Sequence, residues 1–244
     1  MKNAFSIQYL GCSAFVLEDV HNHTRLGVDL WTPGAFKYAE DTPANHQLQD
    51  GSQLTALLVS HDHADHAYLP AGITEKYAFL DDQIEDHPQL ANIGRFNISS
   101  FSTFHFVTPS DHPKMCAAFV LHFDGITLLD LADSFGTMAK SNRLSELKEK
   151  IGDIDILLLP IGSPFLRPVA LDILQQTVEI LNPRVLIPIH YWAVEQKTDF
   201  CTAFSRAGWQ IVSPEHNRLA IEGKPGEQVK EVWSIPPGIF DPGL

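Results

Sequence analysis

The hexapeptide His61-Asp62-His63-Ala64-Asp65-His66 directly follows the apolar run Thr55-Ala-Leu-Leu-Val-Ser60. A short continuous apolar run is typical of a strand buried on both faces, so the hexapeptide is expected just past the end of a core strand. The four residues at the H-x-H-x-D-H positions, His61, His63, Asp65 and His66, carry the imidazole nitrogens and carboxylate oxygens that zinc-type ions prefer. A solvated polar loop with accidental histidines is the weaker alternative, because so many ligand types stand together. The sequence therefore predicts a metal site here.

The spacing within the hexapeptide predicts two ions rather than one. His61 and His63 are two residues apart, so in an extended segment both side chains project to one side. Asp65 and His66 are adjacent, cannot share that direction, and are better placed to bind a second ion. Hydrolases with two metal ions hold them ~3.5–4 Å apart.

Two further apolar runs place a ligand type at the corresponding position. The run Ile126-Thr-Leu-Leu-Asp-Leu-Ala132 ends at Asp133, and Val185-Leu-Ile-Pro-Ile189 ends at His190. Ligands of α/β proteins bind where strands leave the core, so both side chains are candidate metal ligands. The alternatives are a carboxylate that caps a helix for Asp133 and a hydrogen-bonded histidine at the core edge for His190.

Apolar patterning elsewhere indicates an α/β fold. Strands and helices are expected to alternate after residue 54, which predicts sheets covered by helices. Residues 31–53 are expected to form a long loop, and residues 67–100 show no clear pattern. The expected strands are 5–9, 13–18, 25–30, 55–60, 116–123, 126–131, 154–160, 185–189, 209–212 and 219–222, with helices over 143–150 and 169–181.

Length and composition restrict the class of protein. The 244 residues suit one domain over residues 1–244. A net charge of −13 repels phosphate backbones, so a small-molecule substrate is expected rather than nucleic acid. The sequence has no run of about 18 apolar residues, so no membrane span is expected. The widely spaced Cys12, Cys116 and Cys201 suit a reducing compartment. A cytoplasmic location is the expectation, and a homo-oligomer is compatible with the sequence.

These residues resemble the metallo-β-lactamase superfamily, whose signature H-x-H-x-D-H stands at residues 61–66. The phrases Tyr9-Leu-Gly-Cys-Ser-Ala-Phe15, Asp155-Ile-Leu-Leu-Leu-Pro-Ile-Gly162 and Ile187-Pro-Ile-His-Tyr191 are similar to small stand-alone hydrolases related to ascorbate-6-phosphate lactonase. The resemblance covers about residues 5–195 and specifies no substrate. It implies a four-layer αββα sandwich of two mixed sheets with a dinuclear site at one edge.

The resemblance also implies how the candidate ligands divide between the ions. His61 and His63 would hold the first ion, and Asp133 would bridge both. Asp65, His66 and His190 would hold the second.

The resemblance further requires a third histidine for the first ion, before the Asp124-Gly125 hairpin. We expect His112, because it lies on a loop before the next strand. His105 lies in an alternating stretch that predicts a strand, and His122 lies near the hairpin tip.

Three positions depart from the family or leave a choice open. Relatives commonly have His at the position of Cys12, which is expected here to be a small buried apolar residue. Ala132 replaces the usual Gly. Asp29 braces the metal loop in the family, although here it could equally cap a turn.

The expected activity is hydrolysis of a lactone, ester or phosphodiester by hydroxide held between two divalent ions. Asp65 would orient the nucleophile and carry a proton. Zinc is the expected metal, with manganese or iron as alternatives. The rival functions are an iron-dependent redox enzyme on the same fold and a metal-binding module without catalysis. Candidate pocket residues are Ser163, Phe165, Arg167, Tyr191 and Trp192.

Overall fold

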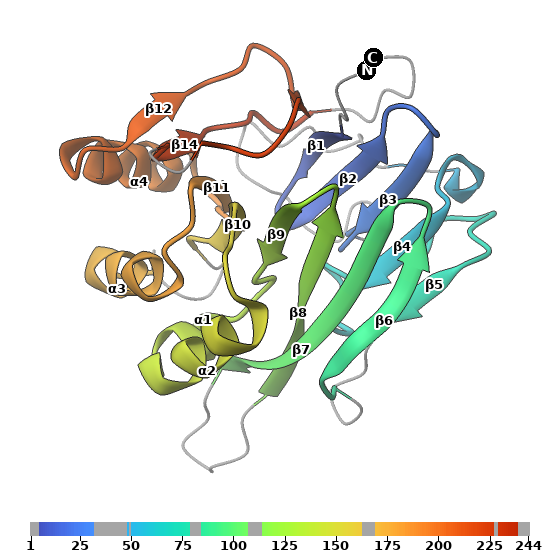
Figure 1. Cartoon of the computed structure of the whole chain (residues 1–244), viewed down its shortest axis with the longest axis horizontal. Coiled ribbons are helices and arrows are strands. Elements are labelled where there is room, and N and C mark those ends of the chain that lie inside the picture. The colour runs from blue at the N-terminus through green and yellow to red at the C-terminus, as the bar shows by residue number, and fades with distance from the viewer. Residues whose placement is uncertain are drawn as a thin grey trace.

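Two mixed β-sheets packed face to face form the centre of the computed structural model (Figure 1). The structure describes residues 5–31, 48, 50–78, 84–106, 114–162, 169–226 and 229–238. The α/β class with two mixed sheets is as predicted.

The first sheet has six strands in the order β13-β1-β2-β3-β4-β5. Its pairs from β13 to β3 are antiparallel, whereas β3, β4 and β5 run parallel. In chain order the strands are β1 (Phe5–Gly11), β2 (Ala14–Asp19), β3 (Thr24–Val28), β4 (Ala56–Val59), β5 (Lys76–Ala78) and β13 (Arg218–Ile221).

The second sheet has eight strands in the order β12-β14-β11-β10-β9-β8-β7-β6. The strands from β12 to β9 run parallel, and those from β9 to β6 are antiparallel. They are β6 (His87–Ile93), β7 (Phe96–Phe106), β8 (Lys114–Phe123), β9 (Ile126–Asp130), β10 (Ile156–Pro160), β11 (Val185–Ile189), β12 (Gln210–Val212) and β14 (Glu231–Trp233).

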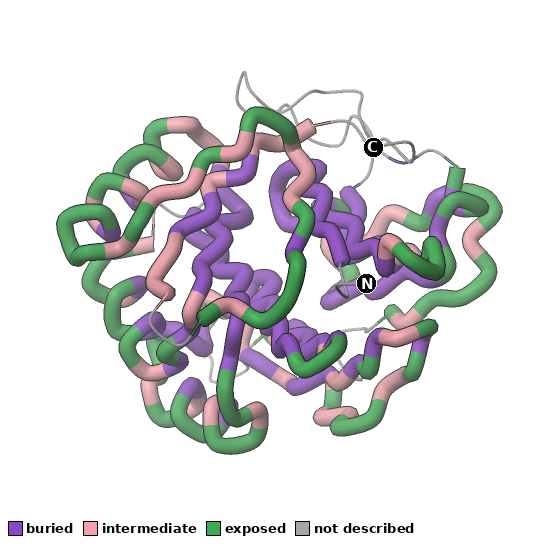
Figure 2. Tube along the Cα trace, turned by 45° about the horizontal axis from the view of Figure 1, so that its top comes forward, coloured by how far each residue is buried: buried purple, intermediate pink, exposed green. Residues whose placement is uncertain are grey.

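The first sheet is buried on both faces. Phe15 and Leu17 of β2 face the core between the sheets, while Ala14 and Val16 face a smaller core on the outer side. This smaller core includes side chains from connecting segments, such as Trp31. Figure 2 shows the buried interior and the exposed outer layer. All seven residues of β1 are therefore buried, although Ser6 and Gln8 alternate with apolar residues in the pattern of a half-buried strand.

The helices pack beside the second sheet (Figure 1). The predicted α2 (Ser141–Ile151) and α3 (Leu171–Leu181) are confirmed, and α3 ends at Asn182 in the left-handed conformation. The one-turn α1 (Phe135–Met138) and α4 (Val194–Arg206) were not predicted. No described helix is long and apolar enough to cross a bilayer.

Helices do not alternate with strands before residue 131. Six strands, β4 to β9, follow one another there, with β6 and β7 in the stretch that showed no clear pattern. The strand β6 lies at the sheet edge and is mostly exposed, so it lacks the apolar alternation of a half-buried strand. Its neighbour β7 is eleven residues long, and the residues after Ser100 extend beyond the part that pairs with β6.

Candidate metal centre

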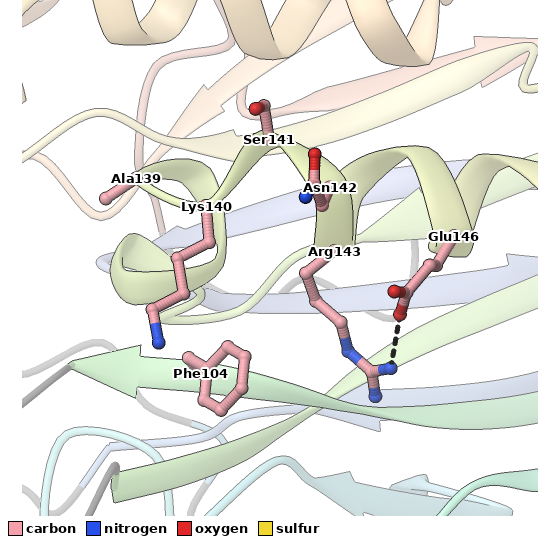
Figure 3. Close-up of a pocket in the computed structure, with 7 residues that line it drawn as sticks. All are labelled: Phe104, Ala139, Lys140, Ser141, Asn142, Arg143 and Glu146. Carbon is pink, nitrogen blue, oxygen red and sulfur yellow. Dashed lines mark hydrogen bonds and ion pairs between the residues drawn. The ribbon is translucent and has the colours of Figure 1, made fainter. Parts of the chain in front are cut away.

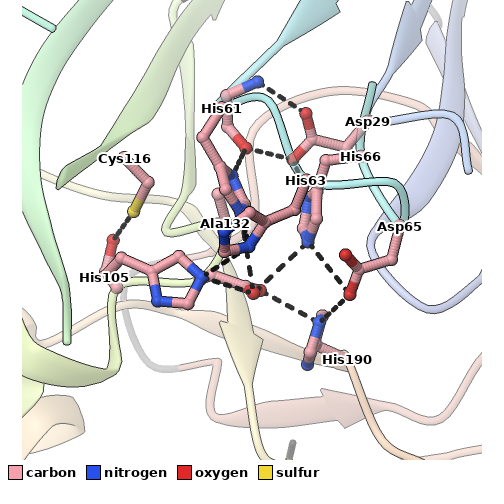
Figure 4. Close-up of polar contacts among 12 residues, drawn as sticks. Asp29, His61, His63, Asp65, His66, His105, Cys116, Ala132 and His190 are labelled. Atoms are coloured by element: carbon pink, nitrogen blue, oxygen red, sulfur yellow. Dashed lines mark hydrogen bonds and ion pairs between the residues drawn. The ribbon is translucent and has the colours of Figure 1, made fainter. Parts of the chain in front are cut away.

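Four strands deliver ligand-type side chains to one edge of the sandwich (Figure 4). The hexapeptide at 61–66 follows β4, and Asp133 follows β9. His190 directly follows β11, as predicted, and His105 lies within the last two residues of β7. The structure brings together two groups that can each hold a metal ion, His61, His63 and His105 in one, and Asp65, His66, Asp133 and His190 in the other.

The hexapeptide forms a turn, so the prediction of an extended segment is wrong. The carbonyl of His63 accepts hydrogen bonds from the backbone N–H groups of His66 and Ala67, at 2.9 Å each. This turn brings His61 and His66 close together, with ring centroids 4.2 Å apart. Asp62 occupies an exposed position of the turn and belongs to neither group.

The first group consists of three imidazoles that point at one another. Nδ1 of His63 lies 3.0 Å from Nε2 of His61 and 3.2 Å from Nε2 of His105. His61 is fully buried, whereas His63 and His105 are partly exposed, so this group faces the opening of the site.

The second group surrounds two carboxylates. Nε2 of His190 lies 3.1 Å from Oδ1 of Asp133 and 3.4 Å from Oδ2 of Asp65. Nε2 of His66 lies 3.7 Å from the same oxygen of Asp65. All four residues are buried.

Asp133 links the two groups. Its Oδ2 lies 3.3 Å from Nε2 of His66 in the second group. The same oxygen lies 3.4 Å from Nε2 of His105 and 4.0 Å from Nε2 of His61 in the first group. Oδ2 of Asp133 therefore lies within 4.0 Å of imidazole nitrogens from both groups.

Asp29 braces the hexapeptide by hydrogen bonds to Ser60 and His66. Of the two roles left open for it, bracing the metal loop and capping a turn, the structure shows the first. Oδ1 of Asp29 accepts a hydrogen bond from the backbone N–H of Ser60 at 2.7 Å. Its Oδ2 accepts from Oγ of Ser60 at 2.6 Å and from Nδ1 of His66 at 2.8 Å. Ser60 Oγ also lies 2.9 Å from Nδ1 of His61, so Asp29 supports one histidine of each group.

The Nε2 atoms of His66 and His190 are suited to bind a cation. Nδ1 of His66 donates to Asp29, and Nδ1 of His190 donates to the carbonyl of Gly162 at 2.7 Å. Such partners set the tautomer that leaves Nε2 with a free lone pair for a metal. Nε2 of His66 and Oδ1 of Asp133 are buried without a hydrogen-bond partner among the described residues. A buried polar atom costs free energy unless it is satisfied, and a metal ion would satisfy these two. The donor set therefore fits a divalent cation.

Left-handed backbone conformations at non-glycine residues gather around the site. Cys12, Asp29, Ala132 and His190 have φ values of 54°, 45°, 46° and 52°. Each lies within two residues of the end of a strand, where the chain turns sharply out of the sheet. Non-glycine residues in this region cost about 1–3 kcal/mol each and persist where the surroundings impose them. The strain marks this edge of the sandwich as functional.

The charges of the metal-free site are strongly coupled. Burial lowers the pKa of His61 well below its usual range, and burial also lowers the pKa of His63. Burial would also lower the pKa of His66 and His190, but the carboxylate of Asp133 raises both well above the usual range. Against the effect of burial, His190 and His66 hold the pKa of Asp133 well below its usual range.

Metal binding at neutral pH is expected to release protons from His66 and His190. Their raised pKa values keep both imidazoles protonated in the metal-free chain, and a cation displaces the proton from Nε2. The apparent affinity should therefore weaken as the pH falls. Calorimetric titration in buffers of different ionisation enthalpy measures the released protons. A binding heat that is the same in all buffers contradicts the expectation.

Among the described residues, the third histidine of the first group is His105. His105 lies in a strand, as predicted, but that strand carries its imidazole into the first group rather than away from it. The expected ligand His112 lies outside the described residues. His122 is half-buried and contacts Oγ1 of Thr127 at 3.1 Å, outside both groups. The alternation around His105 predicts a strand, but it does not show how far that strand extends along the sheet.

The predicted pocket residues are only partly described. Ser163, Phe165 and Arg167 lie outside the described residues. Tyr191 is buried and packs on Tyr9, with ring centroids 6.1 Å apart. Trp192 is half-buried, and its ring centroid lies 6.0 Å from that of His190.

Sequence reasoning missed the contacts that Phe135 and Cys12 make with the ligands. Phe135, at the start of α1, lies with its ring centroid 5.5 Å from His190 and 6.5 Å from His105. Cys12 is buried as expected, but its thiol also contacts His190, and its carbonyl accepts the backbone N–H of His190 at 2.7 Å. No local pattern marked either residue.

A separate surface pocket of about 530 Å³ lies where α1 leads into α2 (Figure 3). Within it, Nζ of Lys140 lies 4.6 Å from the centroid of the Phe104 ring, and Arg143 pairs with Glu146 at 2.8 Å. None of its lining residues belongs to either metal-binding group. We therefore place the candidate site at the histidine groups and not in this surface pocket.

Comparisons with known sequences agree with this arrangement. A family model described as "Beta-lactamase superfamily domain" matches residues 6–190. A UPF0173 metal-dependent hydrolase of Thermococcus onnurineus is 25% identical over 203 residues, covering 76% of this chain and 84% of that protein. Another, of Pyrobaculum calidifontis, is 27% identical over 204 residues, covering 76% and 83%.

Solved structures show the same fold. A Thermotoga maritima protein assigned to the Zn-dependent hydrolases of the metallo-β-lactamase superfamily has a TM-score of 0.55 and 20% identity, covering 94% of this chain and 97% of that one. CmlA, a diiron β-hydroxylase of Streptomyces venezuelae, has a TM-score of 0.56 and 13% identity, covering 89% and 54%. With the family model matching most of its length and the fold shared with these structures, the chain belongs to the metallo-β-lactamase superfamily.

Proposed function

We propose that this protein is a metal-dependent hydrolase that binds two divalent cations side by side and acts on a small carbonyl or phosphoryl substrate. The observation that carries the proposal is the pair of ligand groups joined by Asp133. The names of the Thermococcus and Pyrobaculum relatives, metal-dependent hydrolases, support it.

The two ligand groups divide the cations between them. His61, His63 and His105 would hold the first cation. Asp65, His66 and His190 would hold the second, and Asp133 would contact both. Imidazole and carboxylate ligands suit zinc, and they also accept manganese or iron.

The cations and the protein have separate tasks. Two bound cations would lower the pKa of a water molecule to about 7 and polarise the oxygen of the substrate. Asp65 would accept the proton of the attacking water. Although burial opposes it, the hydrogen bond from His190 lowers the pKa of Asp65, so this carboxylate is ionised at neutral pH. Asp65 is also more exposed than Asp133, at 7% against 3%.

Asp29, Ser60 and the carbonyl of Gly162 would keep the imidazoles in place throughout the reaction. Their hydrogen bonds hold the Nδ1 sides of His61, His66 and His190. The ligands are thereby preorganised, and binding a cation requires little rearrangement. Preorganised groups of this kind cost no reorganisation when charge develops at the reacting atoms.

Replacing His105 by alanine is expected to lower the metal content from about two ions per chain to about one, because the first group keeps only two imidazoles. Hydrolysis should fall with it. Elemental analysis of zinc-loaded protein, together with a panel of sugar-phosphate lactones, acyl lactones and phosphodiesters, measures both. His122→Ala is the matched control, since His122 lies outside both groups.

His112→Ala decides between the two candidate histidines. Loss of one ion in His112→Ala, with two retained in His105→Ala, would restore the sequence-based assignment. Zinc-loaded protein without activity on the whole panel contradicts the hydrolase. Iron-loaded protein that consumes oxygen would favour the redox alternative, for which the fold of the diiron β-hydroxylase is a precedent.

A further inference from the structure

Two aromatic side chains flank His190 at the metal centre. The ring of Phe135 lies 5.5 Å from that of His190 at an interplanar angle of 65°, and the ring of Trp192 lies 6.0 Å away at 68°. Both contacts are edge-to-face, so the imidazole of His190 packs against two aromatic rings. His190 itself is only 1% exposed, whereas Phe135 and Trp192 are half-buried. A molecule approaching this ligand therefore meets the aromatic rings before it meets the imidazole.

Phe135 also lies beside a ligand of each group. Its ring centroid lies 6.5 Å from that of His105 in the first group, besides its contact with His190 in the second. A substrate that reaches both proposed cations must therefore lie next to this ring. Apolar surface left partly open beside a polar centre gains about 25 cal/mol per Å² when an apolar group covers it.

The positions of both rings are fixed by the segments that position the ligands. The backbone N–H of Phe135 donates to the carbonyl of Asp133 at 2.7 Å, and Oγ1 of Thr137 in the same turn accepts the backbone N–H of Phe104, next to His105, at 2.5 Å. The backbone N–H of Trp192 donates to Oε1 of Gln196 at the start of α4, at 2.7 Å. Both rings are therefore held in position before a substrate binds, and they form apolar walls beside the ligands.

From this geometry we infer that Phe135 and Trp192 are specificity-determining residues, and that the substrate is an uncharged ester or lactone with an alkyl or aryl group. The inference rests on the proposed hydrolase function and adds the substrate class. The apolar group packs on the two rings while the carbonyl faces the ligand groups. A charged group against the same rings would lose its hydration and gain no hydrogen bond from them.

A pair of lactones with the same ring tests the inference. Zinc-loaded wild type is expected to hydrolyse γ-nonalactone with a kcat/KM on the order of 10- to 100-fold above that of γ-butyrolactone, which corresponds to burying about two or three of its five additional carbons at roughly 0.8 kcal/mol each. Most of this preference should lie in KM. Phe135→Ala should lower kcat/KM for γ-nonalactone much more than kcat/KM for γ-butyrolactone, and so remove most of the preference. Phe135→Leu, which keeps an apolar side chain, should retain it.

Trp192→Ala should act like Phe135→Ala. Trp209→Ala is the matched control, because Trp209 is also half-buried but packs on Phe204, with ring centroids 5.8 Å apart. Equal rates on the two lactones in wild type would overturn the inference. So would an equal loss on both lactones in Phe135→Ala, or a preference for 6-phosphogluconolactone over γ-nonalactone.

Binding without turnover separates this inference from the hydrolase proposal. 2-Octanone has a carbonyl but no bond to hydrolyse, and calorimetry can follow its binding to the metal-free chain. Binding that weakens at least about fivefold in Phe135→Ala supports the apolar walls even if no lactone is hydrolysed. Equal binding of 2-octanone to wild type and Phe135→Ala overturns the walls even if lactones are hydrolysed.

Discussion

Asp133→Asn is expected to abolish the binding of both cations and to lower hydrolysis by more than about 100-fold. A partner that only orients a ligand is worth about 10- to 100-fold in metal affinity or activity, and Asp133 faces both ligand groups directly. Its Oδ2 lies within 4.0 Å of imidazole nitrogens from His61, His66 and His105. Asparagine keeps the shape but lacks the negative charge that offsets two cations. Elemental analysis and zinc titration against a competing chelator measure the effect.

Asp62→Asn is the matched control for this substitution. Asp62 belongs to the same hexapeptide as four of the ligands, but it is exposed and lies in neither group. Its variant should keep wild-type metal content and activity. Two ions retained in Asp133→Asn would show that Asp133 does not join the groups, and would remove the main support for a dinuclear site.

Asp29→Asn is expected to weaken zinc binding by about 10- to 100-fold without touching a ligand. The carboxylate of Asp29 accepts a hydrogen bond from Nδ1 of His66 at 2.8 Å and another from Oγ of Ser60 at 2.6 Å. If the amide nitrogen of asparagine faces His66, Nδ1 becomes the acceptor and the imidazole proton moves to Nε2. That nitrogen then has no lone pair for the cation. Affinity should fall in both groups, because Ser60 connects Asp29 to His61 as well.

Circular dichroism and proton release on zinc binding distinguish a loss of ligand orientation in Asp29→Asn from a loss of folding. Circular dichroism should show a folded Asp29→Asn chain, and the proton release on zinc binding should change because the His66 tautomer has changed. A folded variant with wild-type affinity and wild-type proton release contradicts the orienting role. Asp86→Asn provides a surface control, since Asp86 pairs with Lys150 away from the site.

The local signals in the sequence predicted much of the metal centre. The apolar runs before His61, Asp133 and His190 mark strands that end at one edge, and the structure brings all three side chains together there. Such runs can be recognised because burial on both faces demands continuous apolar sequence. The hexapeptide also indicated the superfamily, since its ligand types and spacing are specific.

The weaker signals failed where neighbouring structure decides the outcome. The helix α4 buries Phe200 and Phe204 but has five consecutive residues, 195–199, that are polar, and its apolar pattern was missed. The strand β1 looked half-buried because Ser6 and Gln8 alternate with apolar residues, yet both are buried. Whether a polar face is covered depends on segments distant in sequence.

The sequence by itself determined the superfamily and most of the ligand types, because the residue types and spacing of the hexapeptide are specific, and the two-sheet class was implied by the resemblance to that superfamily. Only the tertiary structure decided that His105 joins His61 and His63, that Asp29 supports both groups, and that Phe135 lies beside a ligand of each. The pairing of β7 with β8 places Thr103 opposite Cys116 and carries His105 to the site. Strand length and register are set by long-range packing, and local patterns do not encode them.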